Sequence, residues 1–427
     1  MPQGRTFAVV AACVLLLVLA PAARATEIVS ANDTARFLAG MSPAPDSPLA
    51  AWTKSSAWQE HARIFVSAFE RLEQHQLSRI RTWSESNLTA PRPTMLYMFS
   101  GPDYLYANAF FPKATTYVLS GLEPVGTVPN LAAMRGSVAP TLHRLRASLS
   151  TILSYSFFIT HNMRSDLRIG RLTGTLPILY VFLARSGKTI QEVTPVRLDS
   201  EGAVQPDVGP VRGSAAGGVK IVFTSSDGEA RTLYYFTTDL SNEGARSSKF
   251  LKFCETLAPG DSLIKSASYL LHSGGFSIVR DFLLTKSAVV VQDDSGIPLA
   301  YYDPHKWNLQ PFGHYRGPIV NFSSKYQPKY AVFFKNSRPI DFGIGYRWRP
   351  HESNLLLAVK TLADVVPEAS GQPAPKVQES EGSTSQPVTP IHHSTARRAP
   401  IHHSAARQRR EPVSQATWPS FDWFSRR

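Results

Sequence analysis

Titratable and aromatic side chains are concentrated in residues 299–350, which makes this stretch the best candidate for ligand binding or chemistry. Thirteen of its fifty-two residues are aromatic, whereas aromatic residues make up 11% of the whole chain. Aromatic faces stack on sugar rings or bases, and cations pair with carboxylates or phosphates. We therefore predict the main ligand-facing surface here, with eight binding residues: Asp303, His305, Trp307, His314, Tyr315, Arg316, Arg347 and Arg349.

The same stretch carries most of the positive charge of the central part of the chain. It has eight basic and two acidic side chains, a net charge of +6, whereas residues 26–365 together have +8 and the complete chain has +13. This balance predicts an anionic partner, such as a polysaccharide or another component of the cell envelope. We expect no nucleic acid as partner, because the protein is predicted to be exported. The sequence predicts neither a metal ion nor a cofactor.

Two classes of function remain open at this stage. The first is a non-catalytic binding protein that contacts an anionic polymer through residues 299–350. The second is an extracytoplasmic hydrolase with acid and base groups drawn from four residues: Asp294, Asp303, His305 and His314. Their mutual distances decide between the two, because a general acid and base must converge within hydrogen-bond reach of a substrate.

Two short strings resemble catalytic motifs. Gly260-Asp261-Ser262-Leu263 is similar to the nucleophile block of GDSL-type esterases, but no strand is predicted before it, so we expect Asp261 to cap a helix through residue 271. Asp294-Ser295-Gly296 resembles the catalytic triplet of aspartic proteases. Because no second triplet is present, we expect these residues to form the turn of a hairpin between strands at 288–292 and 297–302.

Residues 95–123 have the order strand, Gly-Pro turn, helix, strand and then an acidic residue, Glu123. This order loosely resembles the nucleotide-binding start of Rossmann-like methyltransferases. Phe99 and Asp103 stand where that pattern has the glycines that let the backbone approach a ligand. The resemblance therefore implies a topology more than a cofactor, and we recognise no characterised family in the chain as a whole.

The remaining local patterns predict the fold class. We expect residues 26–50 to be an extended lead-in, and a helix to begin after Ser55 or Ser56, where apolar residues recur with helical spacing. Asp227-Gly228 predicts a hairpin between strands at 219–224 and 231–237. The fold is thus predicted to be α/β or α+β, with a mixed sheet, packed helices, β-hairpins in the C-terminal half and a disordered C-terminal tail.

The two ends of the chain differ in composition from the rest. Residues 1–25 have the short basic start, 14-residue apolar run and small-residue cleavage site of a signal peptide, so we predict a periplasmic or secreted protein that begins near Thr26. No later apolar run reaches membrane-spanning length. Residues 366–427 are predicted to be a disordered, basic tail rich in His and Pro, in which a His-His unit occurs twice.

Between these ends, residues 26–365 are predicted to form the globular core, which could divide into two subdomains near 200–218. After cleavage of the signal peptide, Cys254 is the single remaining cysteine. No disulfide can therefore form within one mature chain, and the core must be held together by hydrophobic burial.

Overall fold

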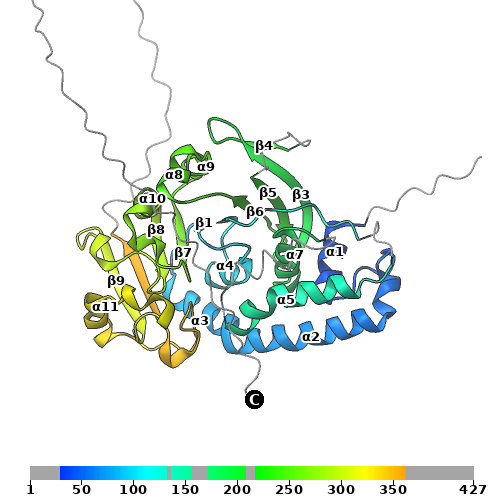
Figure 1. Cartoon of the computed structure of the whole chain (residues 1–427), viewed down its shortest axis with the longest axis horizontal. Helices are drawn as coiled ribbons and strands as arrows, with labels where there is room; N and C mark the ends of the chain where they lie inside the picture. The colour runs from blue at the N-terminus through cyan, green and yellow to red at the C-terminus, as the bar shows by residue number, and fades with distance from the viewer. Residues whose placement is uncertain (1–28, 132–135, 156, 158–171, 208–216, 362–427) are drawn as a thin grey trace, which may run out of the picture. The chain divides into compact units, whose positions relative to one another are not determined.

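The computed structural model describes residues 29–131, 136–155, 157, 172–207 and 217–361 of the 427. The predicted signal peptide and the predicted tail, with its His-His units, lie outside these residues. The described residues form one mixed sheet of ten strands with helices packed on it (Figure 1). The strands are β1 Thr94–Tyr97, β2 Thr116–Gly121, β3 Thr189–Leu198, β4 Val204–Pro206, β5 Gly218–Thr224, β6 Ala230–Thr237, β7 Gly260–Ile264, β8 Ser287–Gln292, β9 Trp307–Gly313 and β10 Asn354–Lys360.

The centre of the sheet is parallel and both of its margins are antiparallel. The strand order is β4-β3-β5-β6-β2-β1-β7-β8-β10-β9. Parallel pairing runs from β6 through β2, β1 and β7 to β8. On one side β5, β3 and β4 continue the sheet antiparallel, and on the other side β10 and β9 do so. The strands β3 and β5, which flank residues 200–218, pair directly with each other.

The order of the parallel strands contains a switch point beside β1. From β1 the chain builds outward through β2 and β6, and then returns to place β7 and β8 on the other side of β1. The loops that leave β1 and β7 therefore diverge to opposite sides, and ligands of open α/β sheets bind at such divergences. This arrangement agrees with the topology that the sequence pattern of residues 95–123 implies.

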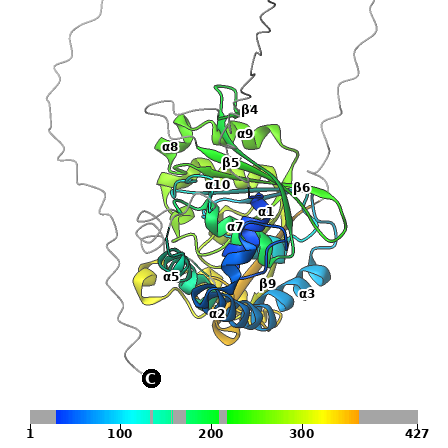
Figure 2. The ribbon, with the colours of Figure 1, turned by 90° about the vertical axis from the view of Figure 1, so that its right-hand side faces the viewer.

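Helices cover both faces of the sheet, because alternate residues of the central strands are apolar on both sides. Met95 and Tyr97 of β1 belong to one core, and Leu96 and Met98 belong to the other. Figure 2 shows the first face, with α1, α2, α5 and α7 on it. The helices on this face are α1 Ala31–Leu38, α2 Ser56–Leu72, α3 Ser78–Asn87, α4 Tyr104–Phe110, α5 Ala139–Tyr155 and α7 Leu176–Arg185. The other face carries α8 Asn242–Ser247, α9 Phe250–Thr256, α10 Ser277–Lys286 and α11 Pro328–Phe333.

Several local signals in the sequence are confirmed. Ser55 caps α2 through a hydrogen bond from the Trp58 amide, and Asp103 caps α4. The Asp227-Gly228 hairpin forms between β5 and β6. The α/β fold with a mixed sheet and antiparallel strands in the C-terminal half is as predicted.

Three local predictions are wrong. Residues 31–38 of the expected extended lead-in form α1, whose N-cap is Ser30. Residues 260–264, expected to begin a helix capped by Asp261, form the buried strand β7. Residues 297–302 are not a strand, because β8 pairs instead with β7 and with the distant β10. In each case burial against remote elements overrides the local pattern.

Candidate functional site

The loops that follow β1 and β7 hold the backbone in rarely adopted conformations. Among the described residues, the non-glycine positions with positive φ are Phe99 (65°), Ser266 (53°), Ser268 (51°) and Tyr269 (55°). All of them lie at the switch point between the two strands. Left-handed backbone at non-glycine residues costs free energy and gathers at functional sites. The loops after β1, β7 and β8 therefore form one candidate site, called the switch-point cluster.

A buried ion pair joins the first two loops. The ammonium of Lys265, the residue after β7, lies 2.9 Å from Oδ2 of Asp103, and both side chains are 2% exposed. The Tyr97 hydroxyl donates to the same carboxylate oxygen at 3.0 Å. The Lys265 ammonium also lies 4.0 Å from the centre of the Tyr106 ring. The ion pair thus connects β1, β7 and the start of α4 through one carboxylate.

Two adjacent carboxyl groups follow β8. Asp293 accepts from the Ser266 amide at 3.0 Å, which fixes the strained loop after β7. Asp294 accepts from the Tyr269 hydroxyl at 2.7 Å and from the Asn354 amide group at 3.2 Å. The turn that the sequence predicts at Asp293-Asp294-Ser295-Gly296 is therefore present, but it ends a parallel strand and its carboxyl groups point into the protein.

Burial sets the protonation of this pair. It raises the pKa of both Asp293 and Asp294, and the neighbouring charge of Asp294 raises the pKa of Asp293 further. A buried carboxyl group with a raised pKa can hold a proton that an exposed carboxyl group would already have lost. Both residues are at most 4% exposed. Such chemistry would therefore require a ligand to enter between the loops.

Residues 342–347 also reach the switch point. The Tyr346 hydroxyl donates to the Ser266 carbonyl at 2.9 Å and lies 3.0 Å from Oγ of Ser268. The backbone of Gly345 passes so close to Asp293 that a Cβ atom at this glycine would lie 1.8 Å from Oδ2 of Asp293. Part of the sequence-predicted binding stretch therefore closes the cluster from outside.

The four acid–base candidates of the hydrolase hypothesis do not lie together. Asp303 and His305 are exposed before β9, where the Asp303 carboxylate accepts from the His305 amide at 2.9 Å. His314 is exposed at the other end of β9, and a seven-residue strand is about 20 Å long. Asp294 is buried in the switch-point cluster.

The predicted aromatic contacts divide into buried and surface residues. Trp307 is 5% exposed and packs edge-on against Tyr302, so it belongs to the core. Tyr315 is half-buried, accepts from the Gln327 amide at 2.9 Å and stacks on Tyr326. Some of the many aromatic residues in 299–350 therefore pack in the core, and others lie at the surface.

The predicted arginines differ in the same way. Arg347 donates to the carbonyls of Gly317 and Pro318, at 3.0 and 2.9 Å, and holds a loop in place. Arg349 is about half exposed, and its Nη1 lies 3.7 Å from Oε1 of Glu352. Arg316 is exposed and makes no hydrogen bond or ion pair with the part of the chain that the structure describes.

Arg316 belongs to a group that we call the basic surface, made of Arg316, Lys325, Tyr326 and Lys329. All four residues are exposed. The ring of Tyr326 lies against Gly317, and the next residue, Gln327, donates from its side chain to the Asp294 carbonyl at 3.2 Å. The charge of Lys325 adds to the burial that lowers the pKa of His272 to about 4. The basic surface therefore lies beside the switch-point cluster.

The string Gly260-Asp261-Ser262-Leu263 has a structural role. Oγ of Ser262 lies 2.7 Å from Oγ of Ser287, which links β7 to β8. The Asp261 carboxylate accepts from the Arg92 amide at 2.7 Å. Both side chains are almost fully buried, and no histidine is among their hydrogen-bond partners in the described chain. This is a strand contact and not a nucleophile with its base.

Asp261 should make stability depend on pH. Burial raises its pKa from 3.8 to about 6, so the folded protein binds the proton more tightly than the unfolded chain does. The stability that protonation provides is complete below pH 3.8 and is lost as the pH rises to about 6. We expect the free energy of unfolding of Asp261→Asn, relative to that of wild type, to rise by up to about 3 kcal/mol as the pH is raised from 4 to 7. Urea unfolding of both proteins across this pH range measures the difference in unfolding free energy. A difference that does not change with pH would contradict the prediction.

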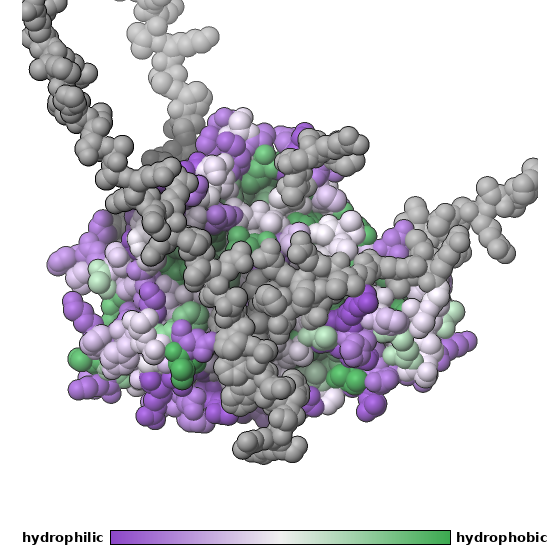
Figure 3. Space-filling view, in the orientation of Figure 1, coloured by the Kyte–Doolittle hydropathy of each residue, from purple (hydrophilic) through white to green (hydrophobic). Residues whose placement is uncertain are grey.

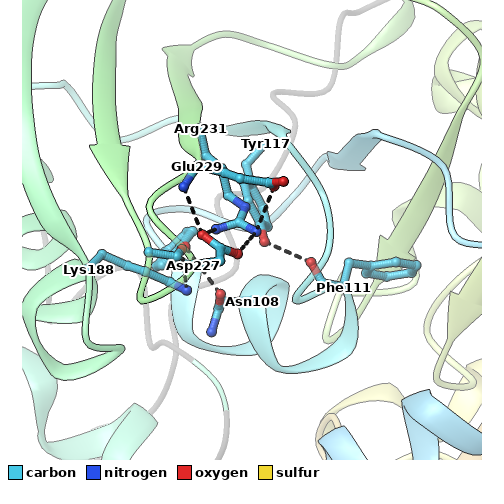
Figure 4. A network of polar contacts seen from close by, with 9 residues as sticks. Asn108, Phe111, Tyr117, Lys188, Asp227, Glu229 and Arg231 are labelled. Carbon is cyan, nitrogen blue, oxygen red and sulfur yellow. Dashed lines mark hydrogen bonds and ion pairs between the residues drawn. The ribbon is translucent and has the colours of Figure 1, made fainter.

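A second polar network lies at the opposite ends of the parallel strands, where β2 and β6 begin (Figure 4). The Arg231 guanidinium is 6% exposed and donates two hydrogen bonds to Asp227, at 3.1 and 2.5 Å. Lys188 donates to Ser225 at 2.9 Å, and burial lowers its pKa to about 8. These contacts hold the turn between β5 and β6, so we assign them a structural role.

Among the described ranges, no three His, Cys, Asp or Glu side chains are placed together to hold a metal ion. None of the helices within those ranges has the length and hydropathy needed to cross a membrane. No protein-family model matches the sequence, and no curated protein gives a significant match. Function must therefore be argued from the sites themselves.

Four members of the switch-point cluster that carry its main contacts were not singled out as functional from the sequence: Asp103, Lys265, Tyr269 and Asp293. Asp103 was noted only as a residue that stands where the nucleotide-binding pattern has a glycine, and Lys265 fell inside the helix wrongly expected from Asp261 through residue 271. The available signal was an apolar run that ends directly in polar residues, as at β1 and β8. This signal marks the carboxyl edge of a parallel sheet only once β7 is recognised as a strand.

Proposed function

We propose that the protein is exported and binds an anionic polymer or another anionic component of the cell envelope through the basic surface. The observation that carries this proposal is that the three cations of the basic surface are exposed and unpaired. Arg316, Lys325 and Lys329 are exposed and form no ion pair or hydrogen bond with any described residue. In addition, residues 304–340 contain six basic side chains and no acidic one.

Unpaired cations beside an exposed aromatic ring favour a ligand that has anionic groups next to sugar rings or other polar groups. The charges remain available because nothing in the described chain neutralises them. The Tyr326 ring is 53% exposed and offers a flat face between them. Arg347 and Arg349, by contrast, are engaged by neighbouring carbonyls and by Glu352.

We expect the triple variant Arg316→Ala, Lys325→Ala and Lys329→Ala to bind anionic envelope polysaccharide about 10- to 100-fold more weakly than wild type. The estimate takes about 0.5–1 kcal/mol for each exposed ion pair. Wild-type binding should also weaken when salt is raised from 0.05 to 0.5 M, since salt screens exposed charges. Titration of purified polysaccharide at the two salt concentrations measures both effects.

The matched control replaces three other exposed cations by alanine: Lys54, Arg63 and Lys113. It changes the net charge equally and leaves the basic surface intact. Control and wild type should bind alike. If the control loses as much affinity as the test variant, binding follows net charge alone and the basic surface is not the site.

The hydrolase hypothesis is the second candidate, and of the four residues first expected it keeps Asp294 and adds Asp293. Its acid–base pair would be Asp293 and Asp294, whose strained surroundings and raised pKa values favour it over Asp303, His305 or His314. Turnover of a chromogenic ester or glycoside by wild type, abolished by Asp294→Asn and retained by Asp303→Asn, would favour this hypothesis over simple binding.

A further inference from the structure

Exposed apolar side chains lie among the cations of the basic surface. Val320 is 88% exposed and Val332 is 63% exposed, and Tyr326 between them is 53% exposed. Single exposed apolar residues are ordinary. Three within thirteen residues, in a stretch without acidic side chains, form a mixed apolar and basic surface. Figure 3 shows hydrophobic atoms between hydrophilic ones at its lower left, where Figure 1 places α11.

The local structure explains why these valines point outward. In α11 the buried Tyr330 stacks on Phe334 at 4.5 Å, so this side of the helix belongs to the core. Lys329 and Val332 are three residues apart and are therefore neighbours on the helix surface. The short helix over residues 320–325 directs Phe322 toward Tyr269, with the centres of the two rings 5.0 Å apart, and leaves Val320 in solvent. Both short helices thus bury aromatic rings and expose a valine.

We propose that this surface binds the headgroup region of a membrane that contains anionic lipids. The inference rests on the proposed function and names its partner. Arg316, Lys325 and Lys329 would pair with lipid phosphates, while Tyr326 would lie at the interface between headgroups and acyl chains. Val320 and Val332 would enter the acyl boundary, as the apolar residues of interfacial helices do. A soluble anionic polysaccharide offers the charge but no apolar phase for the valines.

The test uses the full mature chain and two probes: vesicles of phosphatidylglycerol and phosphatidylcholine, and the anionic polysaccharide of the preceding experiment. We expect Val320→Ser with Val332→Ser to weaken vesicle binding about tenfold, from the lost burial of two partly inserted valines. The same variant should bind polysaccharide as wild type does. Each cation removed should weaken vesicle binding about fivefold. The matched control, Val66→Ser with Val128→Ser, replaces two valines that are 39% and 43% exposed outside the surface.

The outcomes separate the inference from the proposed function. Vesicle binding that the valine substitutions leave unchanged overturns the membrane inference, as does equal binding to vesicles of phosphatidylcholine alone. If polysaccharide binds and vesicles do not, the proposed function stands and this inference fails. If the triple cation variant binds both probes as wild type does, both fail. Circular dichroism and melting temperatures confirm that each variant is folded.

Discussion

Lys265→Met should lower the free energy of unfolding by about 3–5 kcal/mol, because it leaves the Asp103 carboxylate buried without its cation. Both side chains are 2% exposed, and their charged atoms lie 2.9 Å apart. Methionine fills a similar volume, so the loss should come from the unpaired charge and not from a cavity. Urea unfolding at pH 7 measures it.

The double variant Asp103→Asn with Lys265→Met should recover much of this loss. Asparagine removes the buried charge. Its Oδ1 can still accept from the Tyr106 amide and cap α4, and its Nδ2 can donate to the Tyr97 hydroxyl in place of the bond that Oδ2 of Asp103 accepts. Lys306→Met, at an exposed lysine, serves as the control and should change stability by less than about 0.5 kcal/mol. If the double variant is as unstable as the sum of its single substitutions, the ion pair is not the interaction that matters.

Gly345→Ala should be comparably destabilising, by about 3 kcal/mol or more. A Cβ atom at this position would lie 1.8 Å from Oδ2 and 2.7 Å from Cγ of Asp293. Asp293 is 1% exposed and accepts from the amides of Ser266 and Ser295, so it cannot move aside without breaking those bonds. Thermal unfolding, followed by circular dichroism, measures the effect.

Gly187→Ala provides a matched control for the backbone. Gly187 has a φ of +68°, close to the +71° of Gly345, but nothing lies within 4 Å of a Cβ atom there. Its substitution should cost only about 1 kcal/mol, the strain of a left-handed alanine. Equal losses for the two variants would mean that backbone strain, and not contact with Asp293, makes Gly345 necessary.

The elements that could be predicted from sequence are those with signals inside the element. Ser55 precedes an apolar helical pattern, and Asp227-Gly228 lies between two alternating runs, so α2 and the β5–β6 hairpin are recognisable. β7 has no such signal. It contains Asp261 and Ser262, polar residues whose partners, the Arg92 amide and Oγ of Ser287, come from elsewhere in the chain.

The candidate site shows the same limit. Charge counting identified Arg316 within residues 299–350, because every cation contributes to the net charge, whether it is free in solvent or engaged by other groups. It could not separate Arg316 from Arg347, which the carbonyls of Gly317 and Pro318 engage. Nor could it pair Asp103 with Lys265, because that contact depends on β7 lying next to β1.

The central position of β1 also constrains the order in which the chain can fold. β1 pairs with β2 through residues close in sequence, Thr94 with Thr116, but its other edge pairs with β7, Met95 with Asp261. Strands β1 to β6 can therefore assemble before β7 joins them, whereas β7 and β8 complete the parallel sheet only by closing a long loop, a slow step in folding. Until that closure, the edge of β1 is open to pairing with other chains. Formation of the Asp103–Lys265 contact thus reports that the two halves of the sheet have joined.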